Sequence, residues 1–97
     1  MNDKILNLLG IARRANRITI GFDSVKSSIK AQKSCLILFA CDLSERTKEQ
    51  VKNIAKCKTI TTKYTAEEFF TALSKRGGII SINDEGFSQK ILELLGI

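Results

Sequence analysis

The sequence predicts an α/β domain in which helices pack on both sides of a sheet. Four short stretches of strand propensity alternate with segments of helical periodicity along 97 residues. No proline interrupts the chain, and no low-complexity linker divides it. At this length the economical architecture is a three-layer α/β/α sandwich, formed by residues 1–97 as a single domain.

The elements of the first half follow from local patterns. A helix is expected over residues 3–13, where apolar side chains recur at i, i+3, i+4 and i+7. Residues 17–20 have strand propensity, and Gly21 closes that strand. The next helix is expected over residues 22–33, with a row of lysines beside its apolar face. Residues 34–41 form a continuous apolar run, as expected of a central strand covered on both faces.

A third helix is expected over residues 45–56, with Ser44 as its N-cap. Helical spacing assigns its inner face to four residues. They are Thr47, Val51, Ile54 and Ala55. Residues 58–62 alternate in polarity and predict a second strand beside the central one.

The last elements have clear start signals. Thr65 and Glu68 have the spacing of a capping box ahead of a fourth helix that contains two consecutive phenylalanines. Residues 75–78 form a basic, glycine-containing loop, and residues 79–82 form the next buried strand. A fifth helix follows Gly86.

The net charge of +6 is concentrated in the first third of the chain. Residues 1–33 contain seven Lys or Arg residues against two acidic ones, whereas residues 34–97 contain nine against eight. Such an asymmetry predicts a basic face, for which a polyanion is the natural partner.

Several function classes are disfavoured by composition. Without histidine there is no Ser-His or Cys-His pair, and a serine-lysine pair at Ser44 and Lys48 is explained by helix capping. The three cysteines form no C-x-x-C pair, which argues against a zinc site and a disulfide framework. No apolar run approaches the ~20 residues of a membrane span, and the first residues lack a signal-peptide pattern. We expect a cytoplasmic protein that is not an enzyme and that uses no cofactor, metal or membrane.

The turn at Gly21 is the strongest candidate site. A glycine before a helix lets the backbone approach a ligand, and the first N–H groups of the helix point outward to an anion. Lys26 and Lys30 add positive charge on that helix. A plain strand-to-helix connection with a solvated lysine face explains the same residues. The Gly77-Gly78 pair, which follows Lys75 and Arg76, is either a backbone surface that approaches a nucleic acid or only a mobile turn.

Short motifs occur in a fixed order from about Ile5 to Leu95. They are Leu8-Leu9-Gly10-Ile11-Ala12-Arg13-Arg14-Ala15, then Gly21-x-Asp23, then Asp42-Leu43-Ser44 with Thr47-Lys48, and finally Asp84-Glu85-Gly86-Phe87. In this order they closely resemble the bacterial proteins related to ribosomal protein L7Ae. The resemblance implies a three-layer α/β/α sandwich around a mixed four-stranded sheet. It also implies binding of kink-turn RNA, whose tandem sheared G·A pairs widen the groove between two helices.

In such proteins the helix after the turn glycine presents its N-terminus to the G·A pairs, and a separate loop covers the bulged nucleotides. Charge and resemblance together give a set of candidate RNA-binding residues. They are Arg13, Arg14, Arg17, Gly21, Phe22, Asp23, Ser24, Lys26, Ser27, Lys30, Asp42, Ser44, Lys75, Arg76, Gly77, Gly78 and Ile79. We expect structured RNA, ribosomal RNA included, as the partner of a protein that is monomeric when free.

Three positions depart from the archaeal pattern Gly-x-Asn-Glu-x-x-Lys, the first of them Asp23, which stands at the asparagine. Ser24 stands at the glutamate and Ser27 at the lysine, with Lys26 one residue earlier. A second hypothesis therefore remains open, in which the fold has lost kink-turn recognition and docks to a protein of the ribosome or translation apparatus.

Overall fold

A computed structural model describes residues 3–97; Met1 and Asn2 of the expected domain lie outside the described residues. The elements alternate as predicted. In chain order they are α1 (Lys4–Arg14), β1 (Ile18–Ile20), α2 (Phe22–Lys30), β2 (Leu36–Phe39), α3 (Glu45–Ile54), β3 (Lys58–Thr61), α4 (Ala66–Leu73), β4 (Ile79–Ile82) and α5 (Glu85–Leu95). No helix within residues 3–97 is long and apolar enough to cross a membrane.

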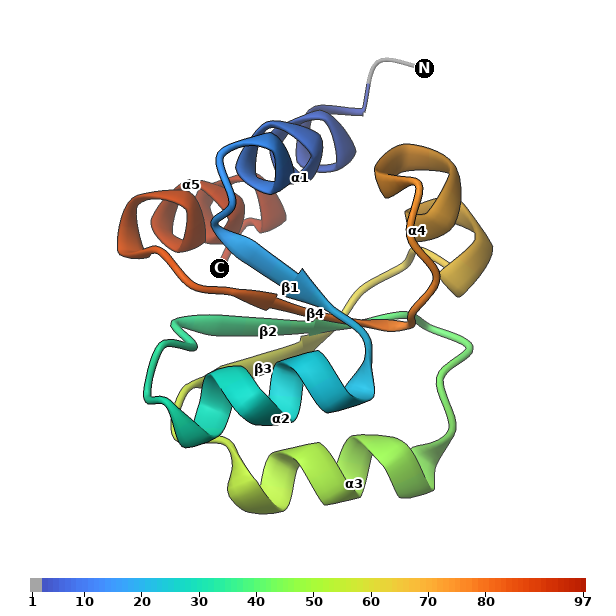
Figure 1. Ribbon diagram of the computed structural model, residues 1–97. Coiled ribbons are helices and arrows are strands. Elements are labelled where there is room, and N and C mark those ends of the chain that lie inside the picture. Colours follow the sequence, from blue (N-terminus) through green and yellow to red (C-terminus); the bar gives the residue numbers. More distant parts are fainter. Residues whose placement is uncertain (1–2) are drawn as a thin grey trace.

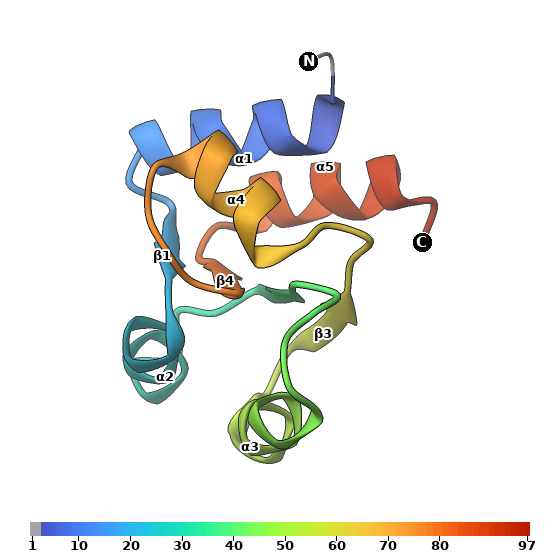
Figure 2. The ribbon, with the colours of Figure 1, turned by 90° about the vertical axis from the view of Figure 1, so that its right-hand side faces the viewer.

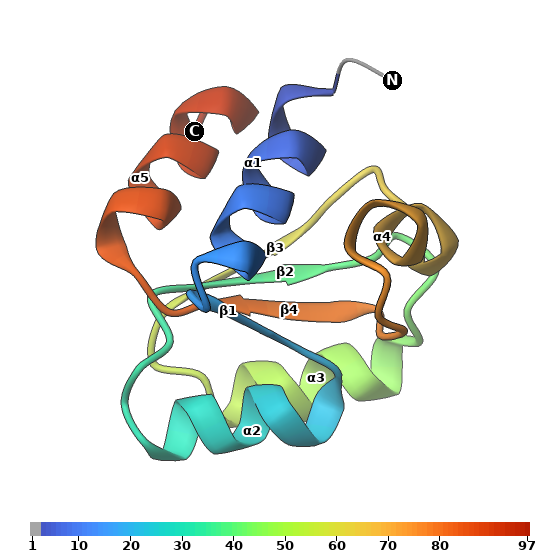
Figure 3. The ribbon, with the colours of Figure 1, turned by 45° about the horizontal axis from the view of Figure 1, so that its top comes forward.

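The four strands form one mixed sheet in the order β1-β4-β2-β3. β2 pairs in parallel with β3, while β4 pairs antiparallel with both β1 and β2. Helices α1, α4 and α5 cover one face, and α2 and α3 cover the other (Figures 1 and 2). Figure 3 shows α1 and α5 packed next to each other above the sheet. The expected three-layer sandwich and the mixed four-stranded sheet are both confirmed.

The central strands bury both of their faces, because helices cover the sheet on both sides. Every residue of β2 and β4 is buried. Leu36 and Leu38 belong to the core under α1, α4 and α5, whereas Ile37 and Phe39 belong to the core under α2 and α3. The alternation follows from the two-residue period of a strand.

Two helices end earlier than their periodicity predicted. α2 stops at Lys30, since Gln32 takes a left-handed conformation with φ 58° that a helix does not continue through. α3 stops at Ile54. The prediction that Ile54 lies on the inner face of this helix is wrong, because Ile54 is 39% exposed. The buried residues of α3 are Lys48 and Val51, so the face is rotated away from Ile54.

Asp3 ties the start of α1 to the β3–α4 connection. Its carboxylate accepts the Leu6 N–H at 3.0 Å and the Tyr64 hydroxyl at 2.8 Å. Burial acts to raise the pKa of Asp3, but the bonds from Leu6 and Tyr64 outweigh it and hold the pKa below the ordinary value of 3.8. Burial and the bond to Asp3 raise the pKa of Tyr64, which therefore stays protonated as the donor.

We expect Asp3 to make the stability depend on acid pH. A lowered pKa stabilises the fold fully above the ordinary pKa of 3.8, and that contribution is lost as pH falls through the lowered value. In Asp3→Asn, which keeps an N-cap side chain without a titrating charge, urea unfolding should vary less between neutral and acid pH. Parallel pH profiles for the wild type and Asp3→Asn would contradict this assignment.

Candidate nucleic-acid interface

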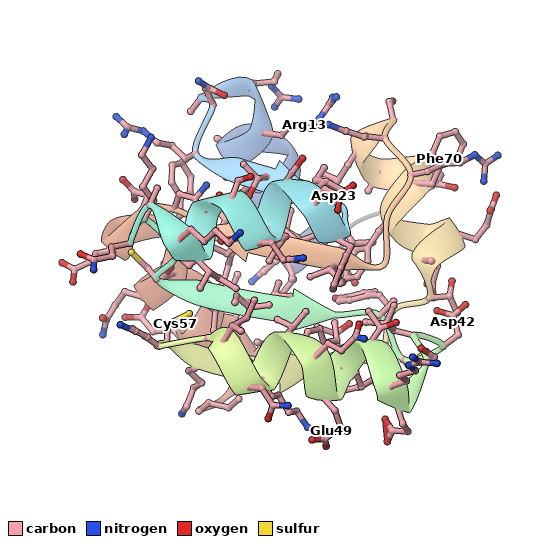
Figure 4. The ribbon with its side chains drawn as sticks, turned by 60° about the horizontal axis from the view of Figure 1, so that its bottom comes forward. Arg13, Asp23, Asp42, Glu49, Cys57 and Phe70 are labelled. Atoms are coloured by element: carbon pink, nitrogen blue, oxygen red, sulfur yellow. The ribbon has the colours of Figure 1, made fainter. Side chains whose placement is uncertain are left out.

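Three connections lie at one end of the sheet, on the right in Figure 1. They are the β1–α2 turn at Gly21, residues 40–44 after β2, and residues 74–78 before β4. Figure 4 shows Asp23, Asp42 and Phe70 toward this end and Cys57 at the opposite one. Candidate residues from distant parts of the sequence therefore share one end of the molecule.

The Gly21 turn is held between β4 and α2. Gly21 has φ 100° and ψ 156°, a conformation essentially limited to glycine. Its N–H donates to the Ile79 carbonyl at 2.9 Å, and its carbonyl accepts the Val25 N–H at 2.9 Å. Glycine is therefore required here for the backbone itself, because the chain turns sharply from the edge strand into the helix.

Helix α2 is fastened to the sheet by its inner face. Val25 and Ile29 are buried in the core under this helix. The Ser28 hydroxyl lies 2.9 Å from the Thr19 hydroxyl and accepts the Asn83 side-chain amide at 3.4 Å. These contacts fix the direction in which the start of the helix points.

The N-terminus of α2 carries no side-chain cap. Among the helices of residues 3–97, the other four begin at Asp3, Ser44, Thr65 and Asp84, each accepting a backbone N–H. Gly21 supplies no such group, and the N–H groups at positions 22–24 precede the first intrahelical bond. The positive end of the helix dipole is thus available to an acceptor from outside.

Gly77 brings the loop before β4 into direct contact with this turn. A Cβ atom at Gly77 would lie 2.9 Å from the Gly21 nitrogen and 2.9 Å from Cγ2 of Ile20. A Cβ atom at Gly78 would lie 3.2 Å from Cδ1 of Leu43 and 3.5 Å from Cβ of Ala40. The two glycines therefore join all three connections into one continuous surface.

The candidate Lys and Arg side chains of this surface form no ion pairs within residues 3–97. The ion pairs within residues 3–97 are Lys48–Glu45 and Lys90–Glu93, so none of the candidate basic residues takes part in one. Lys26 Nζ lies 5.0 Å from the centre of the Phe22 ring, and Arg76 Cζ lies 4.5 Å from that of Phe70. These contacts restrain the two side chains, and their charges remain unneutralised.

Asp42 and Ser44 bind neighbouring backbone groups. Asp42 Oδ1 accepts the Ala66 N–H at 3.0 Å, at the start of α4. Ser44 caps α3 by accepting the Thr47 N–H at 3.2 Å, and its hydroxyl lies 2.8 Å from the Thr47 hydroxyl. Both residues are exposed at the same end of the sheet, with part of their hydrogen-bonding capacity already used.

Two other candidates differ from the rest in how they are placed. Lys30 is the last residue of α2, roughly 12 Å along the helix from Phe22. The Ile79 side chain is 2% exposed, so this residue serves the surface through its carbonyl bond to Gly21.

An open groove of about 340 Å³ lies beside the Gly21 turn. Candidates Arg13, Arg14, Ser24 and Lys75 line it, from three different segments of the chain. The remaining lining residues were missed by sequence reasoning. They are Asn16, Ile18, Thr19 and Ile20. No motif marks them, because the three residues of β1 line the groove only through the place of β1 at the edge of the sheet.

Comparison with known families gives a match over most of the chain. Residues 3–91 match the model of the ribosomal protein L7Ae/L30e/S12e/Gadd45 family. The chain is 30% identical over 93 residues to "RNA-binding protein YlxQ" of Bacillus subtilis strain 168, covering 91% of each chain. It is 29% identical over 94 residues to the protein of the same name from Enterococcus faecium, covering 95% of this chain and 91% of that one.

Solved structures share the fold at lower identity. A Bacillus halodurans protein described as of unknown function superposes with a TM-score of 0.86 at 23% identity, covering 97% of this chain and 98% of that one. The Giardia lamblia 15.5kD RNA binding protein superposes with a TM-score of 0.73 at 15% identity, covering 99% of this chain and 88% of that one. At these identities the likeness concerns the fold alone.

Proposed function

The chain belongs to the ribosomal protein L7Ae/L30e/S12e/Gadd45 family, and on this premise we propose that it is a non-catalytic protein that binds kink-turn RNA, in the ribosome or in translation. The names of its bacterial relatives, which describe RNA-binding proteins, support the class of ligand. Its surplus of basic residues within positions 1–33 supports a polyanionic partner.

The proposal rests chiefly on the contact between Gly77 and the Gly21 turn. This contact makes one surface from the uncapped start of α2 and the loop at residues 74–78. A kink-turn offers two matching features side by side, an opened groove at its G·A pairs and a bulge of unpaired nucleotides. A single rigid surface is suited to engage both at once.

The start of α2 would face the opened groove. An ordinary A-form major groove is too narrow for side chains to read, so the widened groove of a kink-turn is the accessible target. The N–H groups at positions 22–24 would donate to acceptors such as phosphate or base oxygens. Asp23 offers a carboxylate to the amino groups of guanine or adenine, and Ser24 offers a hydroxyl that both donates and accepts.

The loop at residues 74–78 would cover the bulged nucleotides. Gly77 and Gly78 carry no side chains, so a base would be able to approach their backbone closely. Arg76, held over Phe70, places a guanidinium at the rim of this loop. A flat cation is well suited to stack on an unpaired base.

A gel-shift titration tests the proposal. We expect the protein to bind a kink-turn RNA at least about tenfold more tightly than a continuous duplex of the same length, with affinity for both falling as salt rises. The matched control is the same RNA with its G·A pairs replaced by Watson–Crick pairs. Equal affinity for the three RNAs would refute kink-turn recognition.

The second hypothesis, a protein-docking module on this fold, predicts a different result. It is motivated by Ser24 and Ser27, which replace the charged residues of the archaeal pattern. Under it, no RNA preference is seen, and an RNase-treated pull-down at high salt recovers a protein of the ribosome or translation apparatus at fixed stoichiometry.

A further inference from the structure

The groove beside the Gly21 turn has the chemistry of an anion site. Arg13 and Arg14 approach it from the end of α1, Lys75 from the loop before β4, and Ser24 from the first turn of α2. β1 contributes all three of its residues to the lining. None of the lining residues is acidic.

The hydrogen-bond pattern of β1 leaves donors facing out from the sheet. Thr19 lies opposite Ser81 in the antiparallel ladder with β4. The Asn83 N–H bonds the Arg17 carbonyl at 2.8 Å, and the Gly21 N–H bonds the Ile79 carbonyl at 2.9 Å. Antiparallel pairs alternate between bonded and non-bonded, so Thr19 and Ser81 form the bonded pair between these two.

Ile18 and Ile20 therefore form the non-bonded pairs with β4. Their N–H and C=O groups face the free edge of the sheet, because β1 is its outermost strand. No backbone group within residues 3–97 bonds the N–H of either residue outside the ladder. Two parallel N–H donors, with the carbonyls of the same residues beside them, thus lie at the strand edge that lines the groove together with Arg13, Arg14 and Lys75.

The arrangement favours a nucleic-acid backbone over an added peptide strand. An exposed strand edge can accept a peptide, but β1 has only three residues, and short edges flanked by basic side chains discourage strand addition. A phosphodiester needs separate oxygen contacts and negative charge, which N–H donors and cations satisfy.

We propose that this groove holds the phosphodiester backbone of the RNA strand that continues past the Gly21 surface. The inference rests on the proposed function, because the groove adjoins the start of α2 and shares Ser24 with it. This subsite contributes to RNA affinity but does not distinguish kink-turn RNA from duplex RNA. Phosphate contacts position an RNA, whereas the surface at Gly21, Gly77 and Gly78 recognises its shape.

A charge-removal pair tests the role of the groove. The double variant Arg13→Gln/Arg14→Gln should weaken binding to kink-turn and duplex RNA by the same factor, at least about fivefold, and reduce the slope of log affinity against log salt by up to about 2. Its matched control, Lys56→Gln/Lys58→Gln, removes the same charge beside Cys57, at the opposite end of the molecule (Figure 4). That control should stay within about twofold of wild type.

Two results of this experiment would overturn the proposal. One is a double variant that binds both RNAs as the control does. The other is a collapse of the preference for kink-turn over duplex, which would make Arg13 and Arg14 readers of RNA shape. If the wild type itself shows no preference for kink-turn over duplex RNA, the proposed function fails. The phosphodiester subsite is then tested separately, by amide NMR.

Amide NMR gives that independent readout. A short single-stranded oligonucleotide should shift the Ile18 and Ile20 amide signals and leave the Thr19 amide, bonded to Ser81, much less changed. Inorganic phosphate should cause the same shifts only at far higher concentration, because it lacks the chain of charges. Larger shifts with an acidic peptide than with the oligonucleotide, or no shift at Ile18 and Ile20, would contradict a phosphodiester subsite.

Discussion

Replacing Gly77 with alanine is expected to destabilise the protein by about 2 to 4 kcal/mol, a large share of the stability of a domain of this size. The new Cβ would lie 2.9 Å from the Gly21 nitrogen, a backbone atom that is itself bonded to Ile79. The φ of 152° at Gly77 adds backbone strain for any other residue. Because β4 begins just after this loop, neither side of the contact can move without disturbing the sheet.

The measurement is the midpoint of urea unfolding, with Gly96→Ala as the matched control. Gly96 also has a positive φ, 78°, but its Cβ would meet nothing within 4 Å. Gly96→Ala therefore reports the cost of backbone conformation alone, about 1 kcal/mol. If Gly77→Ala proves no less stable than Gly96→Ala, the close contact between the two loops is wrong.

Gly21→Val is expected to reduce kink-turn affinity by at least about tenfold while the core stays folded. Valine disfavours φ 100°, so the turn must change its backbone and redirect the N–H groups at the start of α2. A side chain at this position meets no atom within 4 Å, so the expected fall in affinity comes from the turn and not from a clash in the core.

Gel-shift titration and thermal unfolding together separate the two effects. Gly96→Val is the control, since it carries the same kind of strain at the end of α5, outside the proposed surface. It should lower the melting temperature and leave RNA affinity unchanged. If Gly21→Val and Gly96→Val bind RNA with equal affinity, the Gly21 turn is not part of the binding surface.

Features governed by neighbours in the sequence were predictable. The Thr65–Glu68 capping box and the Ser44 cap form as expected, because a cap needs only residues three positions apart. The apolar run at residues 34–41 contains the central strand β2 for a similar reason. Gly21 was identified by its place between strand propensity and helical periodicity.

Features governed by distant contacts were not predictable from pattern. Nothing near β1 indicates that β4 is its partner, and so nothing indicates that Ile18 and Ile20 keep free backbone groups. The bond from the Ala66 N–H to Asp42 could not be predicted either, because it depends on how two separate connections meet. The inner face of α3 was predicted wrongly at Ile54. Helical spacing places both Lys48 and Ile54 beside Val51, and the pattern alone does not show that Lys48 is the buried one.

The position of β4 between β1 and β2 also bears on how the protein is made. β1 leaves the ribosome well before its partner in the sheet, β4, because five other elements lie between the two in the chain. Synthesis at about 5 to 20 residues per second keeps β1 waiting for several seconds. The Gly21 turn needs the Ile79 carbonyl, so in a nascent chain the proposed binding surface is incomplete until Ile79 has been translated.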